Sequence, residues 1–269
     1  MSPGGGTDVT VDKHLSSERP CITLKRIFMW PFKKSVASLY DSGIFKGFTD
    51  WHSHILPGVD DGIKTLDDSL AVLRRYEELG FRKVWLTPHV MEDIPNTPEK
   101  LRDVFKTLRD AWDGNVEIEL AAENMLDSLF DERLNADEIL PIGSDGTHVL
   151  VETSYFNPPM GFHGMLEDVK SKGFYPVLAH PERYRYMNES DYEELREMGV
   201  KFQANFMSIV GAYGETTRKK LEWMLDKGMI DLTGSDVHRL PIIDEMIKRS
   251  PSRRRHLDAM MEVAQKSID

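Results

Sequence analysis

Short apolar runs alternate with longer amphipathic stretches from residue 47 onward. The short runs show no polar alternation, which predicts strands buried on both faces at 48–52, 83–87, 116–122, 148–151, 175–179, 200–205 and 229–233. The longer stretches carry apolar residues at helical spacing, which predicts helices at 66–79, 97–113, 125–134, 160–172, 189–198, 216–227, 241–249 and 253–266. Gly80 and Gly173 follow two of these stretches and favour a helix end there.

The order of these elements gives seven strand–helix units. Strands joined by helical crossovers run parallel. Seven such units predict an α/β fold, a distorted TIM-like (β/α)7 barrel with parallel strands. An open doubly wound sheet is the alternative that the same pattern allows. In a barrel the active site lies at the C-terminal strand ends, so candidate chemistry is expected there.

Composition refines this picture. The chain has 269 residues, of which 40% are hydrophobic, enough for one barrel-sized domain at 47–269. Residues 1–46 are expected to form an N-terminal extension that is partly disordered, and Met29 is an alternative start. Its segment 25–34 is basic and aromatic, for which an ordinary extension is favoured over contact with an anionic membrane. The net charge of −11 argues against a nucleic-acid partner.

The cysteine count and the hydropathy pattern indicate a compartment. The chain has one cysteine, Cys21, so it has no disulfide framework and a reducing environment is expected. It has no apolar run of about 18 residues, so no membrane span is expected. The first residues also lack the apolar core of a secretory signal. These features predict a cytoplasmic protein.

Residues of the types that bind metal ions follow the predicted strands. His52 and His54 are two apart, so in a strand both imidazoles point to one face, although such a pair alone is a weak signal. Six further candidates follow other strands, and a seventh lies in the turn after the first strand: His89, Glu123, Glu152, His180, Asp236 and His238, with Asp61 in the turn. The remaining histidines, His14, His148, His163 and His256, lie elsewhere.

These nine candidates are too many for one ion, which takes about four to six ligands. Two or three divalent ions would fit, with Glu123 as a natural bridge. Imidazoles and carboxylates without thiolates suit Mn, Fe or Zn, and suit Mg less well. Three divalent ions would carry more positive charge than the four carboxylates carry negative charge. The resulting positive pocket suits a phosphate dianion. Arg183 could grip two phosphate oxygens with its planar fork; an ion pair with Glu182 or Asp191 is the alternative.

With these residues in view, the sequence resembles the PHP (polymerase and histidinol phosphatase) superfamily. Within it, the sequence is similar to the bacterial capsule and exopolysaccharide tyrosine phosphatases of the CpsB/YwqE type. The matching pieces occur in family order: 50–62 (DWHSHILPGVDDG), 87–89 (TPH), Glu123, Glu152, 180–184 (HPERY) and 234–238 (GSDVH). The runs HILPGVDDG and HPERY are specific to this branch.

The resemblance implies a PHP-type phosphatase domain at 47–269 with three metal ions. The implied ligand sets are His52, His54, Glu123 and Asp236; Glu123, Glu152 and His180; and Asp61, His89 and His238. Asp61 is preferred to Asp60 as the ligand from the turn. The family tends to carry a second phosphate-binding arginine where Ile242 and Ile243 stand here. Arg239 is expected to substitute for it.

The same resemblance implies an activity and a partner. The chain would be a metal-dependent protein-tyrosine phosphatase with two to three divalent ions, Mn²⁺ first. Its substrate would be phosphotyrosine on the tail of a membrane-bound bacterial tyrosine kinase that regulates capsule or exopolysaccharide synthesis. We expect metal-assisted attack of water on phosphorus, with Arg183 neutralising phosphate oxygens. His54 and His238 are the candidate proton shuttles where metal binding leaves them free.

Two other functions stay open. One is another PHP phosphoesterase, such as a histidinol-phosphate phosphatase, with the same metals and a different pocket. The other is a metal-binding interaction module without turnover. A cysteine-based tyrosine phosphatase is disfavoured, because that chemistry needs the spacing C-x5-R and Arg26 falls one residue short of it after Cys21.

Overall fold

The computed structural model describes residues 36–268, in which strands and helices alternate along the chain. The strands are β1 (Thr49–Ser53), β2 (Lys83–Leu86), β3 (His89–Val90), β4 (Glu117–Leu120), β5 (Glu123–Met125), β6 (His148–Glu152), β7 (Tyr175–Ala179), β8 (Lys201–Asn205) and β9 (Leu232–Gly234). The helices are α1 (Leu39–Ser42), α2 (Leu66–Leu79), α3 (Pro98–Ala111), α4 (Phe130–Asn135), α5 (Phe162–Ser171), α6 (Glu189–Glu197), α7 (Glu215–Asp226), α8 (Leu240–Met246) and α9 (Arg254–Val263). Two short 3-10 helices, η1 (Pro181–Arg183) and η2 (Phe206–Val210), follow β7 and β8.

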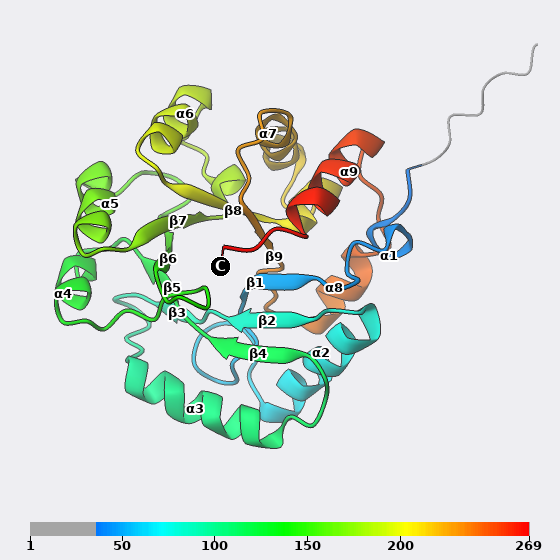
Figure 1. Cartoon of the computed structure of the whole chain (residues 1–269), viewed down its shortest axis with the longest axis horizontal. Coiled ribbons are helices and arrows are strands. Elements are labelled where there is room, and N and C mark those ends of the chain that lie inside the picture. Colours follow the sequence, from blue (N-terminus) through cyan, green and yellow to red (C-terminus); the bar gives the residue numbers. More distant parts are fainter. Residues whose placement is uncertain (1–35, 269) are drawn as a thin grey trace, which may run out of the picture. The chain divides into compact units, whose positions relative to one another are not determined.

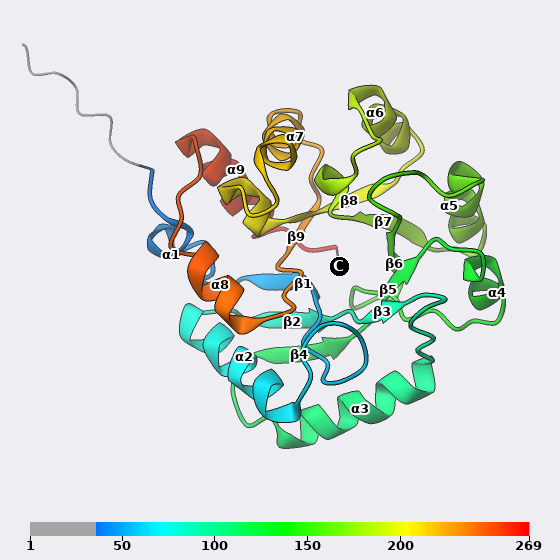
Figure 2. The ribbon, with the colours of Figure 1, turned by 180° about the vertical axis from the view of Figure 1, so that it is seen from behind.

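All the strand pairs are parallel, in the orders β1-β2-β4 and β3-β5-β6-β7-β8-β9. Two residues separate β2 from β3 and β4 from β5, so each of these pairs forms one interrupted strand position. The ring closes where the backbone N–H groups of Ser235 and Asp236 donate to the carbonyl of His52. Seven strand positions surrounded by helices (Figures 1 and 2) confirm the predicted distorted barrel and exclude the open sheet.

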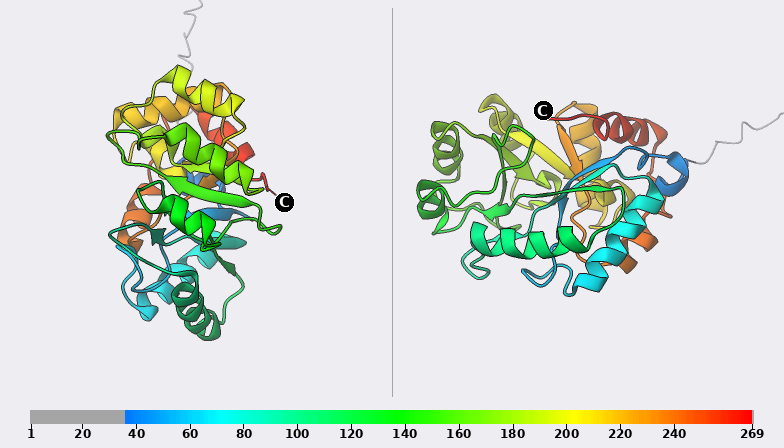
Figure 3. Two further views of the ribbon diagram at one scale, coloured as in Figure 1. Left: turned by 90° about the vertical axis from the view of Figure 1, so that its left-hand side faces the viewer. Right: turned by 60° about the horizontal axis from the view of Figure 1, so that its bottom comes forward.

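Two apolar layers hold this barrel together. The inner layer fills the ring of strands and contains Trp51 and Trp85, whose rings stack with centroids 6.0 Å apart. The larger outer layer lies between the strands and the helices that flank them in the side views of Figure 3. The chain then returns to the middle of the ring (Figure 1), where Ile268 joins the inner layer. The core therefore closes one end of the barrel and leaves the other for polar side chains.

Local sequence explains most element ends. The side chain of Thr65 caps α2, and Gly80 ends it in the left-handed conformation with φ 93°. Around β5 the prediction is wrong in detail. The expected strand at 116–122 is interrupted and continues as β5, so the helix expected at 125–134 begins only at Phe130 and has six residues. Two of the three residues of β5, Glu123 and Asn124, are polar and of low strand propensity, which is why the hydrophobic pattern did not predict a strand there.

The segment before β1 packs onto the barrel. Leu39, Ile44 and Phe45 are buried, and the backbone N–H of Leu39 donates to the carbonyl of Arg249. The boundary expected at residue 46 stays a prediction. Cys21, Met29 and the basic segment 25–34 lie outside the described residues. Among the described residues, no helix combines the length and the apolar character that crossing a membrane requires.

Candidate metal centre

The nine candidate ligands meet at the carboxyl edge of the barrel. They come from β1, β3, β5 and β6 or from the loops that follow β1, β7 and β9. Their ligand atoms fall into four overlapping groups, each within 4.8 Å: His54, Asp61, His89 and His238; His52, Glu123 and His180; His52, His54 and Asp236; and His89, Glu123 and Glu152. The geometry thus brings together every residue that the sequence singled out for metal binding.

Glu123 lies at the centre of this cluster and is fully buried. Its Oε2 atom is 3.2 Å from Nε2 of His52 and 3.0 Å from Nδ1 of His89. Its Oε1 atom is 2.9 Å from Nε2 of His180. A carboxylate with different imidazoles at its two oxygens has the arrangement of a bridge between two ions.

The grouping differs in one respect from the ligand sets that the resemblance implies. Those sets pair Glu152 with His180, but the carboxylate of Glu152 is 4.0 Å from His180 and 2.8 Å from Nδ1 of His89. The His52–His54 pair behaves as the strand spacing predicted, because the two Nε2 atoms are 3.1 Å apart. The nine ligand assignments stay predictions, and the nine side chains meet in one cluster.

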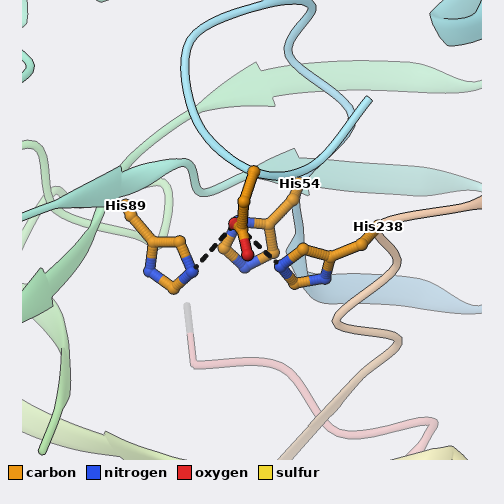
Figure 4. Close-up of side chains that lie close together, drawn as sticks. His54, His89 and His238 are labelled. Atoms are coloured by element: carbon orange, nitrogen blue, oxygen red, sulfur yellow. Dashed lines mark ion pairs between the residues drawn. The ribbon is translucent and has the colours of Figure 1, made fainter. Parts of the chain in front are cut away.

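The two neighbouring aspartates of the turn have different surroundings. The carboxylate of Asp60 is already engaged by neighbouring residues. It lies 2.8 Å from Nδ1 of His54 and accepts hydrogen bonds from the backbone N–H groups of Gly62 and His89. The side chain of Asp61 is 67% exposed, and its Oδ1 atom is 3.5 Å from Nε2 of His89 and 3.3 Å from Nε2 of His238. Figure 4 shows the rings of His54, His89 and His238 gathered there. This geometry supports Asp61 over Asp60 as a ligand.

The donor set fits divalent cations. Oε2 of Glu123 and Oε1 of Glu152 are buried and lie next to imidazole nitrogens, and the buried Nδ1 of His180 has no hydrogen-bond partner among the described residues. Such atoms are costly unless a cation or a donor satisfies them. Burial opposes a charge on His54, but hydrogen bonds to Asp236, Asp60 and Glu123 outweigh it and raise its pKa well above the usual value. The buried carboxylates of the cluster therefore favour positive charge beside them, whether on a protonated imidazole or on a bound cation.

Three residues to which the sequence analysis gave no role surround His52 and His54. Nδ1 of His52 is 2.8 Å from the buried Oε1 of Gln203 on β8. A Cβ atom at Gly234 would lie 2.6 Å from Cβ of His52, and one at Gly62 would lie 2.5 Å from Cβ of His54. The absence of a Cβ atom at each glycine therefore leaves the space that the two histidines occupy. Gln203 stands in a predicted strand with its side chain inward, but only the barrel register shows that it meets His52.

Arg183 lies beside the cluster in an aromatic setting. Its guanidinium pairs with Asp236, and its central carbon lies over the rings of Tyr155 and Tyr213, at 4.6 and 4.3 Å from their centroids. Burial disfavours its charge, yet Asp236 and the two tyrosines keep its pKa above the ordinary value. The hydroxyl of Tyr213 in turn accepts a hydrogen bond from Asn205. Of the alternatives left open, the structure has neither the Glu182 nor the Asp191 ion pair.

A cavity of about 540 Å³ opens next to the cluster. Asp61, Asp236 and His238 line it on the polar side, together with Arg183 and Arg239. Arg239 is exposed and forms no ion pair with any described residue. Apolar side chains complete the wall: Met207, Ala212, Val237, Ile242 and Ile243. Glu245 also lines the cavity, which therefore combines two arginines, three carboxylates and an apolar surface.

The other described histidines lie away from this cluster. His148 pairs with Lys201 at the start of β6, His163 lies on α5 near Glu194, and His256 is buried on α9. His14 lies outside the described residues. The division of histidines made from the sequence therefore holds for those that the structure describes.

The fold and the cluster define a class: parallel α/β barrels that gather imidazoles and carboxylates at the carboxyl edge of their strands, an arrangement suited to divalent cations. Residues 48–264 match the capsular polysaccharide synthesis family CpsB/CapC. The chain belongs to this family.

Individual relatives agree with this assignment. Tyrosine-protein phosphatase CpsB from Streptococcus pneumoniae is 31% identical over 208 residues, which are 71% of this chain and 83% of that protein. Tyrosine-protein phosphatase YwqE from Bacillus subtilis is 26% identical over 197 residues, which are 71% of this chain and 77% of that protein. A solved structure from work on YwqE and CpsB, described as unique metal-dependent tyrosine phosphatases, aligns with a TM-score of 0.67 at 24% identity. The alignment covers 82% of this chain and 96% of that one, and it supports the barrel fold described above.

Proposed function

We propose that this chain is a metal-dependent protein-tyrosine phosphatase. The observation that carries the proposal is the cluster around the buried Glu123, which adjoins a cavity lined by Arg183 and Arg239. The cluster has the donors for two or three divalent ions, and the cavity has the cations for a phosphate. The names of the relatives point to the same reaction.

In this proposal the chain's own residues bind and orient the substrate. The forks of Arg183 and Arg239 donate to the non-bridging phosphate oxygens. The aromatic ring of phosphotyrosine packs against Ile242, Ile243 and Tyr213, which exclude water from one side of it. Histidinol phosphate has an imidazole ring, but that ring is smaller and more polar than the phenyl ring of phosphotyrosine, so it gains less from contact with this apolar wall. The wall therefore favours phosphotyrosine over the histidinol-phosphate alternative.

The metal ligands proposed are His52, His54, Asp61, His89, Glu123, Glu152, His180, Asp236 and His238. Divalent ions bound there would lower the pKa of water and offset the charge of the phosphate. The leaving phenolate has a pKa of about 10, so its departure needs little help from an acid. His54 is fully buried whereas His238 lines the cavity, so His238 is the better placed of the two to supply a proton.

The direct test is hydrolysis of a phosphotyrosine peptide after chelation and after metal is added back. We expect chelation to abolish turnover, and Mn²⁺ to restore it best among Mn²⁺, Fe²⁺, Zn²⁺ and Mg²⁺. Asp236→Ala should lose activity while it keeps a cooperative unfolding transition. The matched control is Asp258→Asn, at an exposed position on α9. Turnover that survives chelation would overturn the metal-dependent mechanism.

Two comparisons separate this function from its alternatives. A higher kcat/KM for histidinol phosphate than for the phosphotyrosine peptide would favour the other phosphoesterase. Stoichiometric metal binding without turnover of either substrate would favour a metal-binding interaction module. Only a preference for the peptide is compatible with the proposal.

We further propose the biological setting. The substrate is a phosphotyrosine protein, in the first place the tail of a membrane-bound bacterial tyrosine kinase that regulates capsule or exopolysaccharide synthesis. The chain would meet that tail in the cytoplasm. The match to a capsular polysaccharide synthesis family supports this setting. Dephosphorylation of such a kinase by the purified chain, followed with an anti-phosphotyrosine antibody, tests it.

A further inference from the structure

A second hollow adjoins the cavity that holds the proposed phosphate site. Its volume is about 390 Å³, and it shares Arg183 and Tyr213 with that cavity. Arg185 and Lys220 also line it, so three cationic side chains surround one hollow. A group bound there would lie next to the group that Arg183 holds, because the two hollows share Arg183 and Tyr213.

The carboxylates of this hollow offset only part of the charge of its cations. The buried Glu182 uses its Oε1 atom to accept from the backbone N–H of Asn205 and from Oγ of Ser208. Both oxygens of Glu215 accept from the guanidinium of Arg218, at 2.7 Å each. Arg183 is paired with Asp236, so the remaining cations, Arg185 and Lys220, face the single carboxylate of Glu182. The hollow therefore keeps excess positive charge on a chain whose net charge is −11.

Two of the cations have no acidic partner. Nζ of Lys220 donates to the backbone carbonyls of Tyr184 and Met187, at 2.5 and 2.7 Å, which fixes its position without cancelling its charge. Arg185 is exposed and forms no ion pair with any residue in 36–268. Its guanidinium lies over the ring of Phe156, 4.9 Å from the centroid, which holds it in place at the surface.

The loop that carries Phe156 also exposes apolar surface. Phe156 is 60% exposed and Met160 is 98% exposed, although both residue types are usually buried. Tyr155 of the same loop contacts Arg183, and its carbonyl accepts the backbone N–H of Arg185 at 2.8 Å. The loop is thus continuous with the phosphate site and fixed to the segment that carries both arginines.

We propose that the hollow and this loop bind the residues that flank phosphotyrosine in the substrate polypeptide. Arg185 takes an acidic or phosphorylated side chain, and Phe156 with Met160 packs against an apolar one. The enzyme would then prefer phosphotyrosine in an acidic context, including a second phosphotyrosine nearby. This inference rests on the proposed function and names the class of peptide that the same site selects.

The test compares matched phosphopeptides with p-nitrophenyl phosphate, which has no flanking residues. One series moves a single glutamate from three residues before the phosphotyrosine to three residues after it; a second series carries glutamine instead, and a third carries a second phosphotyrosine. For the best glutamate position, Arg185→Gln should lower the ratio of kcat/KM for the peptide to kcat/KM for p-nitrophenyl phosphate about two- to fivefold, the range of an exposed ion pair. Arg185→Lys should restore most of the ratio.

A matched control is Lys172→Gln, which removes one positive charge beyond the end of α5, at the far edge of the barrel. Its ratio should equal that of the wild type. Equal kcat/KM for the glutamate and glutamine peptides in the wild type would overturn the inference alone. An equal loss on peptide and p-nitrophenyl phosphate in Arg185→Gln would do the same. A wild-type protein that hydrolyses no phosphotyrosine substrate would contradict the proposed function and, with it, this inference.

Discussion

Oε1 of Gln203 lies 2.8 Å from Nδ1 of His52, inside the barrel and shielded from solvent. An amide oxygen only accepts hydrogen bonds, so this contact places the proton of the neutral ring on Nδ1. The other nitrogen, Nε2, then carries a free lone pair toward Glu123. Gln203 therefore selects the tautomer of His52 that can bind a cation.

Replacing Gln203 with leucine should weaken metal binding without removing any ligand. Loss of a partner that orients a metal-binding histidine typically costs about 10- to 100-fold in affinity. Competition with a chelating dye measures this change, and Gln265→Leu, at an exposed position near the end of the chain, is the matched control. Unchanged affinity in Gln203→Leu would show that His52 needs no such orientation.

Asp60 and Asp61 should separate into a structural and a metal-binding carboxylate. Asp60→Ala leaves His54 and two backbone N–H groups without their acceptor, which should lower the free energy of unfolding by about 1–3 kcal/mol. Asp61→Ala changes an exposed side chain and should stay within about 0.5 kcal/mol while it lowers metal stoichiometry. Urea unfolding of the metal-free protein and metal analysis measure the two effects. The reverse pattern would reassign the ligand to Asp60.

Gly234→Ala should damage the cluster from the backbone. The added Cβ would lie 2.6 Å from Cβ of His52 and 2.9 Å from its backbone nitrogen, too close for either atom to stay in place. We expect a loss of about 1–3 kcal/mol in stability, typical of overpacking, together with weaker metal binding. Gly164→Ala, on α5 with nothing within 4 Å of the new Cβ, should be neutral or stabilising. Equal thermal unfolding of the two variants would contradict this account.

Much of the fold could be predicted because a buried face requires apolar residues to recur along the sequence with the period of a helix or of a strand. The run that became β6 has three successive apolar residues at 149–151 and is fully buried, and α2 shows the spacing, the cap and the glycine of an amphipathic helix. The region around β5 could not be predicted. Its residues, Glu123, Asn124 and Met125, are strand residues because neighbouring strands supply their partners.

The candidate site divides in the same way. Residue type and position near a strand end were enough to select nine candidate ligands that meet in one cluster, since the carboxyl ends of parallel strands share one rim. Arg183 was found by its chemistry. Tyr155, Tyr213 and Gln203 were missed because tyrosines and glutamines are common and only their distances to Arg183 and His52 mark them out.

His148 should make the protein less stable below neutral pH. Burial and the nearby Lys201 lower the pKa of its imidazole, against the opposing charges of Asp145 and Asp231. A histidine in an unfolded chain has a pKa of about 6.5. Below that pH the unfolded chain therefore binds a proton on His148 that the folded chain does not bind. The stability present above that pH is therefore lost as the pH falls toward the folded pKa.

The measurement is urea unfolding at several pH values from about 7.5 to 5.5. His148→Gln cannot take up this proton, so its free energy of unfolding should fall less than that of the wild type over the same range. His163→Gln, at an exposed position on α5, is the matched control for loss of an imidazole. Parallel curves for the wild type and His148→Gln would contradict the prediction.

Tyr213 should act by positioning Arg183. Its ring lies 4.3 Å from the guanidinium carbon, and its hydroxyl is fixed by Asn205. Tyr213→Leu removes a cation–π contact of about 1 kcal/mol, which should weaken inhibition by inorganic phosphate and raise KM about fivefold, with a smaller effect on kcat. Tyr213→Phe keeps the ring and should retain most of the binding. If the phenylalanine variant loses as much as the leucine variant, the hydroxyl and not the ring is what holds Arg183.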